Sequence, residues 1–424
     1  MNILELIDKK RLKKELSYQE LEYIVNNYLN GTIPDYQMSS LLMAITLNGM
    51  SDEETINLTD IMIRSGDTID LSVVDGIVVD KHSTGGIGDK TTLILAPLVA
   101  ASGVRVAKMS GRGLGFTGGT IDKLESIEGF NVEMSFDKFI NQVNDIGISI
   151  VSQMGNLVPA DKKIYALRDI TGTVASIPLI ASSIMSKKIA SGADSIVIDV
   201  KVGNGALVNN IEDARKLANI MIRIGKEYNK KVVCVVTDMN RPLGRAIGNS
   251  IEVMEAINTL RCKGPEDVNE LVITLGSYMV SLGLQISIND AKKIVTEKLR
   301  DGSALKKFFE FVKAQGGNID TLNVSKMVIS IKSSKTGFIK SIDAYNLGNI
   351  VKEIGGGREK KGDKIDYGVG ILLSKQIGDY VLKDEELAKV YINEIDLDVN
   401  RLVDCFEIAN EVGEIPKLIK EIIK

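Results

Sequence analysis

Apolar and polar positions alternate with a helical period over the first 65 residues of the chain. Apolar side chains at positions 38, 41, 42 and 45 keep the i, i+3, i+4, i+7 spacing that places them on one helix face. Ser17 to Glu20 and Ser51 to Glu54 match the capping box, in which serine and glutamate satisfy free N–H groups at a helix start. Glycines follow each predicted helix. The pattern predicts a small helical lobe.

From about residue 76 the chain changes to short runs rich in valine and isoleucine, separated by helical stretches. This alternation is typical of a mostly parallel sheet covered by helices. Ligands of such sheets bind at the carboxyl ends of the strands. The predicted strands are 76–80, 104–108, 148–153, 195–200 and 231–236.

Two more segments complete the predicted outline. Residues 160–171 and 177–191 have helical patterns, whereas from residue 336 short β-like runs alternate with glycine-containing turns. The expected fold is α/β: a small all-helical lobe plus a larger mostly parallel α/β lobe, with a C-terminal α+β domain. The corresponding ranges are 1–66, then 74–155 with 193–330, and finally 336–424.

Composition narrows the class of protein. The chain has 424 residues, a formal net charge of −4 and 25% charged residues, so neither a nucleic-acid nor a membrane partner is expected. No run reaches the ~18 apolar residues of a membrane span, and the N-terminus lacks a signal-peptide core. The three cysteines have no metal-ligand spacing, which favours reduced thiols in a cytoplasmic protein.

Two glycine-rich loops follow predicted strands and precede predicted helices, at Lys81 to Lys90 and Lys108 to Thr120. Glycines let the backbone approach an anion, and a helix start directs free N–H groups toward it. Each loop also carries a lysine and hydroxyl side chains. His82, the only histidine of the chain, lies in the first loop, and histidine is the most frequent general acid or base. The loops therefore predict a phosphate site with acid–base chemistry.

Neither loop fits a familiar nucleotide motif. Asp89 stands between Gly88 and Lys90, where a carboxylate would face the phosphates of a P-loop, and the glycine spacing does not match the dinucleotide fingerprint. The alternative is a pair of tight turns that bind nothing. Both loops carry lysine and hydroxyl side chains, and the first also carries the sole histidine, which argues against turns that bind nothing.

The helices predicted at 160–171 and 177–191 carry two polar pairs. Tyr165 and Arg168 are three residues apart, and Ser183 and Lys187 are four apart, so each pair shares a helix face. Together these side chains offer hydrogen-bond donors to a flat, oxygen-rich ring. Two ordinary solvated helix faces are the alternative from the residues alone.

Several motifs resemble the pyrimidine-nucleoside and thymidine phosphorylases. The longest are K-H-S-T-G-G-x-G-D at 81–89 and S-G-R-G-L-G-x-T-G-G-T-x-D-K-L-E at 110–125. The resemblance covers almost the whole chain, because it continues through D-K-K-x-Y-A-x-R-D at 161–169, S-I-P-L-I at 176–180, K-K at 187–188, D-V-K-x-G-x-G-A at 199–206 and G-G-G-R at 355–358.

The resemblance implies reversible phosphorolysis of pyrimidine nucleosides such as uridine, thymidine and deoxyuridine, for nucleoside salvage. It implies a helical lobe completed by residues 160–192, a homodimer formed through that lobe, and chemistry that requires no cofactor. His82 is implied as the residue near the base oxygen, with Arg168 and Lys187 as its catalytic partners. The implied phosphate ligands are Lys81, Ser83, Thr92, Lys108, Ser110 and Thr120, and the implied base contacts are Tyr165, Arg168, Ser183 and Lys187.

Three residues depart from the family pattern. Phe116 stands where histidine is usual, and Leu207 stands where an aromatic side chain is common. Lys90 replaces a threonine that, in some relatives, helps to bind potassium. The other positions of that structural K⁺ site match, namely Gly88, Leu243, Ala246 and Glu255.

Two rival functions stay open from the sequence. One is a related phosphorylase or phosphoribosyltransferase of the same fold that acts on another base. The other is a nucleotide-binding regulator that has lost catalysis. The intact histidine and phosphate positions favour the pyrimidine phosphorylase over both.

Overall fold

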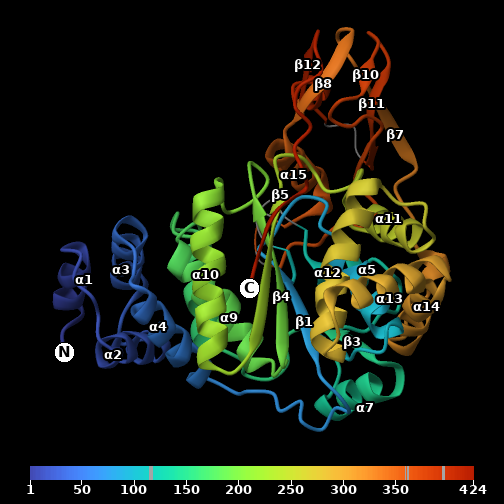
Figure 1. Ribbon diagram of the computed structural model, residues 1–424. Coiled ribbons are helices and arrows are strands. Elements are labelled where there is room, and N and C mark those ends of the chain that lie inside the picture. Colours follow the sequence, from blue (N-terminus) through green and yellow to red (C-terminus); the bar gives the residue numbers. More distant parts are fainter. Residues whose placement is uncertain (114–117, 359, 361, 394–396) are drawn as a thin grey trace.

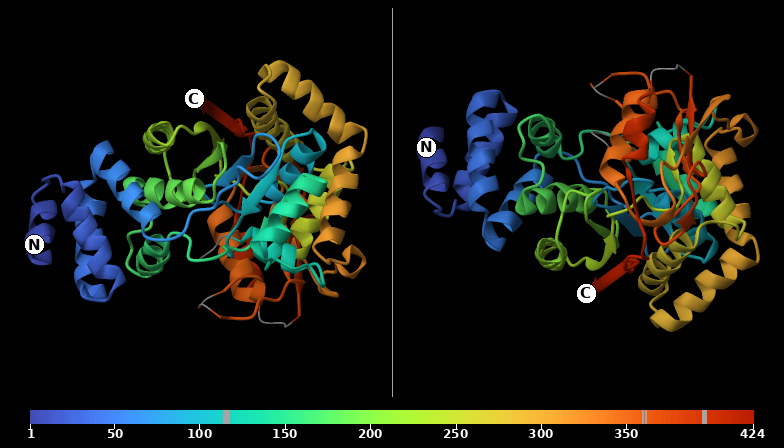
Figure 2. Two further views of the ribbon diagram at one scale, coloured as in Figure 1. Left: turned by 90° about the horizontal axis from the view of Figure 1, so that it is seen from below. Right: turned by 90° about the horizontal axis from the view of Figure 1, so that it is seen from above.

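The computed structural model describes residues 1–424 except 114–117, 359, 361 and 394–396. The helical lobe lies at one end of an elongated molecule, and the sheet with its covering helices forms the larger body (Figure 1, Figure 2). Both predicted capping boxes are present, at Ser17 and at Ser51. The helices of this lobe are α1 Ile3–Arg11, α2 Tyr18–Leu29, α3 Asp35–Asn48, α4 Asp52–Arg64 and α8 Pro159–Asp169.

The main sheet has the order β1-β4-β5-β13. The first three strands are parallel, as predicted, and the last is antiparallel to β5. A parallel bridge between Val78 and Arg105 joins the parallel pair β2-β3 to the β1 edge. The strands are β1 Val79–Ser83, β2 Val106–Met109, β3 Ile148–Val151, β4 Ser195–Val202, β5 Lys231–Asp238 and β13 Ile419–Ile423.

Helices cover both faces of the sheet (Figure 1). On one face, α9 Ile177–Ala190 and α10 Ile211–Glu227 share an apolar core with β4 and β5. Because α9 also packs against α4, it connects the helical lobe to the sheet. The helices of the other face are α5 Thr91–Ala101, α11 Ser250–Leu260, α12 Glu266–Leu284, α13 Ile288–Arg300 and α14 Ser303–Ala314; α6 Thr120–Glu125 and α7 Phe136–Ile146 lie between β2 and β3 in the chain.

Two antiparallel sheets form the third part, in the orders β6-β9-β11-β7 and β10-β8-β12. Its helical segments are α15 Ala344–Val351, the π-helical turn Lys352–Gly356 and α16 Val399–Val403, and a short 3₁₀ turn, Ile319–Thr321, precedes it. Its strands are β6 Ala246–Gly248, β7 Met327–Lys332, β8 Gly337–Ile342, β9 Gly370–Leu373, β10 Tyr380–Val381, β11 Glu386–Ile392 and β12 Phe406–Ala409.

Three boundaries differ from those expected. The first strand spans Val79–Ser83 instead of 76–80, because its pairing with β4 continues to Asp199, so Lys81, His82 and Ser83 are strand residues. The third part starts before residue 336, because β7 pairs with β11. It also ends before residue 424, because β13 returns to the main sheet and pairs with β5.

Within the described residues, no single helix is long and apolar enough to cross a membrane. The pair α12 and α13 passes that test together, but the two helices are bent by 117° at their break. Most of their apolar side chains are buried in the core.

Candidate active site

The end of β1 carries the first predicted phosphate residues. Lys81 is buried, and its Nζ contacts the Thr91 hydroxyl and lies 3.7 Å from Asp89 Oδ1. The same Asp89 oxygen accepts hydrogen bonds from the Thr91 N–H and hydroxyl, at 3.2 and 2.5 Å. Asp89 therefore orders the Lys81 side chain, a role that was not predicted from the sequence. Thr92 is buried in the next position of α5.

A buried carboxylate organises the lysines beside β1. Asp80 is fully buried; its Oδ1 accepts from Lys108 Nζ at 3.2 Å and its Oδ2 from Lys188 Nζ at 2.5 Å. Burial would raise the pKa of Asp80, but the two ammonium groups outweigh it and lower that pKa. Burial, reinforced by neighbouring lysines, lowers the pKa of Lys108 to about 8, although Asp80 opposes the shift. Asp80 was not predicted as a site residue; its one signal in the sequence is a carboxylate inside an apolar strand.

The second glycine loop is described only at its ends. Ser110 donates its N–H to Val151 O at 2.9 Å, and Thr120 begins α6. Asp122 fixes the loop, since it accepts from the Gly113 N–H at 2.6 Å and from Arg358 at 2.8 Å. Arg358 belongs to the G-G-G-R motif, so this contact gives that motif a structural role. Phe116 lies outside the described residues.

The four predicted base contacts lie together on α8 and α9. Lys187 Nζ is 3.0 Å from Ser183 Oγ and 5.3 Å from the centre of the Tyr165 ring, and Arg168 lies 5.6 Å from the same ring centre. Lys187 also donates to Asp161 Oδ2 at 2.8 Å. Asp161 was part of the quoted motif but had no assigned role; it holds the ammonium beside Ser183.

Arg168 is buried and has a structural role in addition to its predicted contact with the base. Its side chain is buried, with 1% of the residue exposed. Its guanidinium donates to two backbone carbonyls of the segment between α8 and α9 and to one in the first turn of α9. The acceptors are Thr173 O at 3.3 Å, Val174 O at 2.8 Å and Leu179 O at 3.0 Å. Arg168 therefore shapes the segment on which the base contacts stand.

His82 is exposed to the positive charge of lysines from both the predicted phosphate ligands and the predicted base contacts. Partial burial lowers its pKa well below the ordinary value, and Lys188, Lys108, Lys187 and Lys81 lower it further. The field of Lys187 comes from the predicted base side, and that of Lys81 from the predicted phosphate side. In the ligand-free protein the imidazole is therefore neutral at pH 7.

The predicted potassium ligands surround a side chain. Lys90 is fully buried, and its Nζ donates to Leu243 O and Ala246 O, both at 2.9 Å, and to the Glu255 carboxylate. Gly88 O accepts the backbone N–H of Lys90 at 2.9 Å. The residues present do not fit a potassium ion at this position, because the Lys90 ammonium already takes the carbonyl and carboxylate oxygens.

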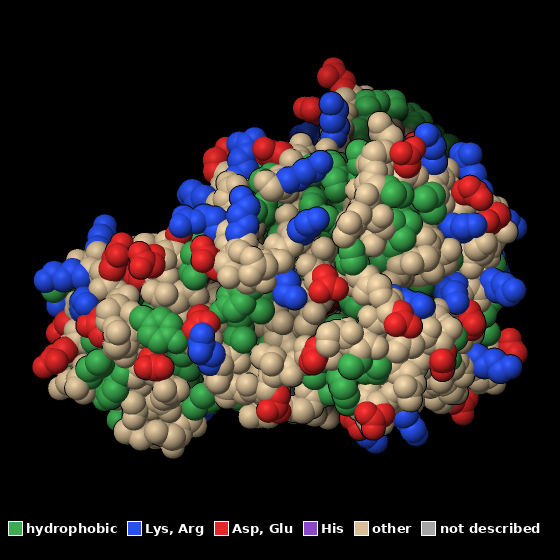
Figure 3. Space-filling model, turned by 60° about the horizontal axis from the view of Figure 1, so that its bottom comes forward, with side chains coloured by type: hydrophobic (Ala, Val, Ile, Leu, Met, Phe, Trp, Pro, Cys, Tyr) green, Lys and Arg blue, Asp and Glu red, His purple; other side chains and the backbone are tan. Residues whose placement is uncertain are grey.

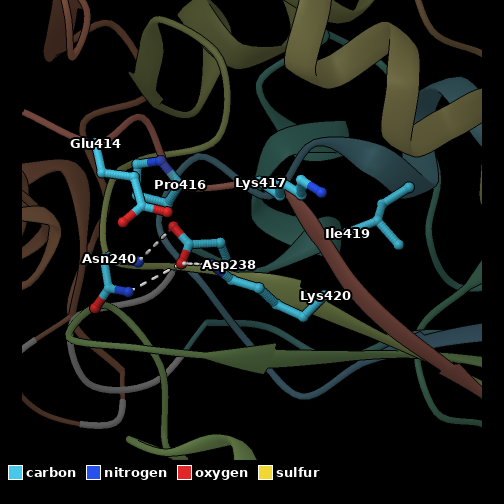
Figure 4. A pocket seen from close by; sticks show the side chains of 7 residues that line it. All are labelled: Asp238, Asn240, Glu414, Pro416, Lys417, Ile419 and Lys420. Carbon is cyan, nitrogen blue, oxygen red and sulfur yellow. Dashed lines mark hydrogen bonds and ion pairs between the residues drawn. The ribbon is translucent and has the colours of Figure 1, made fainter.

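A hollow in the described part of the chain lies away from these residues. A cavity of about 400 Å³ at the carboxyl end of β5 is lined by Asp238, Asn240 and the segment 414–420 (Figure 4). Asn240 Nδ2 donates to Asp238 Oδ1 at 2.9 Å, and Lys420 pairs with the same oxygen at 3.1 Å. None of the predicted phosphate or base residues lines this cavity.

A helical bundle joined to an α/β domain defines a class of glycosyltransferases. The models "Glycosyl transferase family, helical bundle domain" and "Glycosyl transferase family, a/b domain" match residues 4–66 and 75–305. A third, "Pyrimidine nucleoside phosphorylase C-terminal domain", matches residues 338–409. The chain therefore belongs to the pyrimidine-nucleoside phosphorylases, which are pentosyltransferases.

Full-length relatives agree with this assignment. The chain is 51% identical to the pyrimidine-nucleoside phosphorylases of Staphylococcus haemolyticus and of Bacillus subtilis, with all of each chain covered. It is 50% identical to that of Geobacillus stearothermophilus, over 99% of both chains. Anthranilate phosphoribosyltransferase from Thermus thermophilus shares the fold, with a TM-score of 0.57 and 18% identity over 73% of this chain and 98% of that one.

Proposed function

We propose that the chain splits uridine, thymidine and deoxyuridine reversibly with phosphate, releasing the pyrimidine and (deoxy)ribose 1-phosphate in nucleoside salvage. The observation that carries the proposal is the Lys188–Asp80 contact of 2.5 Å. Lys188 follows Lys187, one of the proposed base contacts Tyr165, Arg168, Ser183 and Lys187. Asp80 precedes Lys81, one of the proposed phosphate ligands. This contact fixes the helix that carries Lys187 against the strand that carries Lys81, which supports a site shared by phosphate and a nucleoside.

Phosphate is the nucleophile in this proposal. It is held below C1′ of the sugar by the side chains of Lys81, Ser83, Thr92, Lys108, Ser110 and Thr120. One phosphate oxygen forms a bond to C1′ while the C1′–N1 bond breaks, and the bonding electrons leave with the base. The bound anion stabilises the cation-like sugar, so positioning and preorganised charge supply the rate and no cofactor is needed.

The proposed base contacts stabilise the negative charge that develops on the departing pyrimidine. Lys187, fixed by Asp161 and Ser183, donates to the departing pyrimidine, and Tyr165 and Arg168 complete its pocket. His82 stands between the groups. A bound phosphate dianion offsets the lysine field and raises the His82 pKa, so that the imidazolium can protonate the leaving base.

Substrate breadth follows from Leu207. Its side chain is half-buried against the core formed by β4 and α10, in the loop between β4 and α10. A leucine there is less bulky than an aromatic residue, so both ribose and deoxyribose are accepted.

The proposed assembly is a homodimer formed through the helical lobe. Tyr36, Met43 and Leu47 are 73%, 37% and 76% exposed, and their spacing places them on one face of α3. Hydrophobic side chains are also visible at this end of the molecule, on the left of Figure 3. Covering such a face is a usual role of a dimer contact. A cytoplasmic location belongs to the same proposal, because all three cysteines are unpaired.

An absorbance assay tests the function. The purified protein is incubated with uridine, thymidine or deoxyuridine, with and without phosphate, and base release is followed. Turnover of all three that depends on phosphate is expected. Activity on anthranilate with phosphoribosyl pyrophosphate, or phosphate binding without turnover of any nucleoside, would contradict the proposal.

A further inference from the structure

A single buried ammonium lies where three oxygen-bearing groups meet. Lys90 Nζ donates to two backbone carbonyls and to a carboxylate, and the side chain has no exposed surface. The oxygens come from the segment 243–246 and from α11, more than 150 residues away in the chain. Burial would lower the pKa of Lys90, but Glu255 and Glu252 outweigh it and hold that pKa above its ordinary value. The group is therefore a permanent cation.

The surrounding backbone is built closely around this cation. Gly244 has φ +71°, and a Cβ there would lie 2.3 Å from Glu255 Oε2 and 3.1 Å from Lys90 Nζ. Gly88 has φ +73°, and a Cβ there would lie 2.6 Å from Leu243 O. Both glycines are needed because L side chains rarely adopt these conformations and would also collide with the oxygens. Glu255 is held in turn by the N–H groups of Arg245 and Ala246, at 3.0 to 3.2 Å.

The cation joins the phosphate loop to the rest of the body. Lys90 is the residue before α5, one position from Thr91, which orders Lys81. A second buried lysine reinforces the connection: Lys123 Nζ donates to Asp89 O at 2.9 Å and pairs with Glu252 at 2.7 Å. Glu252 and Glu255 lie on one face of α11, so this helix anchors both residues 89 and 90.

We propose that the Lys90 ammonium is a tethered replacement for a bound monovalent metal ion, which positions the phosphate loop and makes this enzyme independent of potassium. The oxygen set is of the type that a K⁺ ion takes, namely backbone carbonyls and one carboxylate. An ammonium that is covalently attached to the chain occupies this oxygen set and cannot dissociate into the solvent. Lys90 is thus a positioning residue: it acts on phosphate through the loop and does not touch the reacting atoms.

Removing the tether should recreate a metal site. In Lys90→Ala the oxygens remain and the side-chain volume is emptied, so an ion of similar size can enter. In Lys90→Met, the matched control, the volume stays filled and no cation is supplied. Breaking a buried ion pair is strongly destabilising, so in buffer with only tetramethylammonium as cation both variants should melt at least ~5 °C below the wild type.

The experiment is a titration of K⁺, NH₄⁺, Na⁺ and Li⁺ at constant ionic strength, with thermal unfolding followed by circular dichroism. K⁺ or NH₄⁺ should restore the Tm of Lys90→Ala in a saturable way, Li⁺ should do so poorly, and Lys90→Met and the wild type should not respond. A parallel titration of the KM for phosphate should follow the same order. The Tm readout stands even if the proposed reaction is wrong.

Two results would overturn the inference. One is a saturable rise of wild-type Tm or activity with K⁺, which would mean that a metal still binds. The other is Lys90→Ala that equals the wild type without any added ion. If Lys90→Ala does not fold, the response of the wild type to K⁺ decides the question alone. A wild type that does not respond to K⁺ supports the inference, and a wild type that responds contradicts it.

Discussion

Lys188 Nζ of α9 lies 2.5 Å from Oδ2 of Asp80 in β1, and this contact joins the helix that carries Lys187 to the strand that carries Lys81. Lys108 binds the other oxygen of the same carboxylate, at 3.2 Å. One buried negative charge thus pairs with two buried ammonium groups, and Lys108 also donates to the backbone carbonyl of Lys81. Phosphate, as a second anion, would supply the charge that the cluster lacks.

Replacing this carboxylate should damage both stability and catalysis. Asp80→Asn keeps the shape but leaves two buried ammonium groups without a counter-charge, at a cost of about 3–5 kcal/mol of unfolding free energy. The folded pKa of Asp80 is depressed, so its contribution is present above the unfolded pKa of ~3.9 and is lost as pH falls through the folded value. Urea unfolding at several pH values measures this. The exposed Asp145→Asn is the control, and equal losses in the two variants would refute the role of Asp80.

Phosphate binding should weaken at alkaline pH. In the free enzyme Lys108 has a pKa of about 8, so it loses its charge above that pH and attracts the anion less. The predicted kcat/KM for phosphate falls above pH about 8. Lys108→Arg, which stays protonated throughout this range, should flatten the decline. An identical alkaline limb in the wild type and the variant would assign the inflection to another group.

The single histidine permits a direct titration. Imidazole proton resonances in an NMR spectrum belong to His82 without assignment, because no other histidine exists. The His82 pKa is expected below ~6.5 in the free enzyme and higher at saturating phosphate. Ser110→Ala should show a smaller rise, since it holds phosphate less firmly. A titration that phosphate does not move would place His82 outside the phosphate site.

The two cations of the base pocket should separate in their effects. Lys187→Met, made together with Asp161→Asn so that no buried carboxylate loses its ammonium partner, should lower kcat/KM by ~10²–10³ while Tm and phosphate affinity change little, because Lys187 is the proposed, partly exposed donor to the leaving base. Arg168→Lys should lower stability as well, since the carbonyls of Thr173, Val174 and Leu179 lose their guanidinium donors, each at about 1–3 kcal/mol. Calorimetry with steady-state kinetics distinguishes these outcomes. A Lys187→Met enzyme with normal turnover would remove Lys187 from the site.

Local features were well predicted from the sequence, and distant pairings were not. The capping boxes, the parallel strands and the pairing of Ser183 with Lys187 follow from periodicities that each segment carries itself, whereas the grouping of Tyr165 with Lys187 was implied by the family resemblance. The partner of Lys90 is 165 residues away and that of Lys188 is 108 residues away, so no local pattern reveals them. The end of β1 was placed too early because Asp80, Lys81 and His82 interrupt the apolar run, and their neighbours in the fold are what permit charge there.

Phosphorolysis is tested by following the oxygen atoms of phosphate into the products. The enzyme is incubated with uridine and phosphate labelled with ¹⁸O at all four positions, and the sugar phosphate is analysed by mass spectrometry. If phosphate attacks C1′, the ribose 1-phosphate retains all four labelled oxygens, uracil is released in equal amount, and nothing forms without phosphate. Uracil release accompanied by free ribose, or at the same rate without phosphate, would identify a hydrolase and contradict the account.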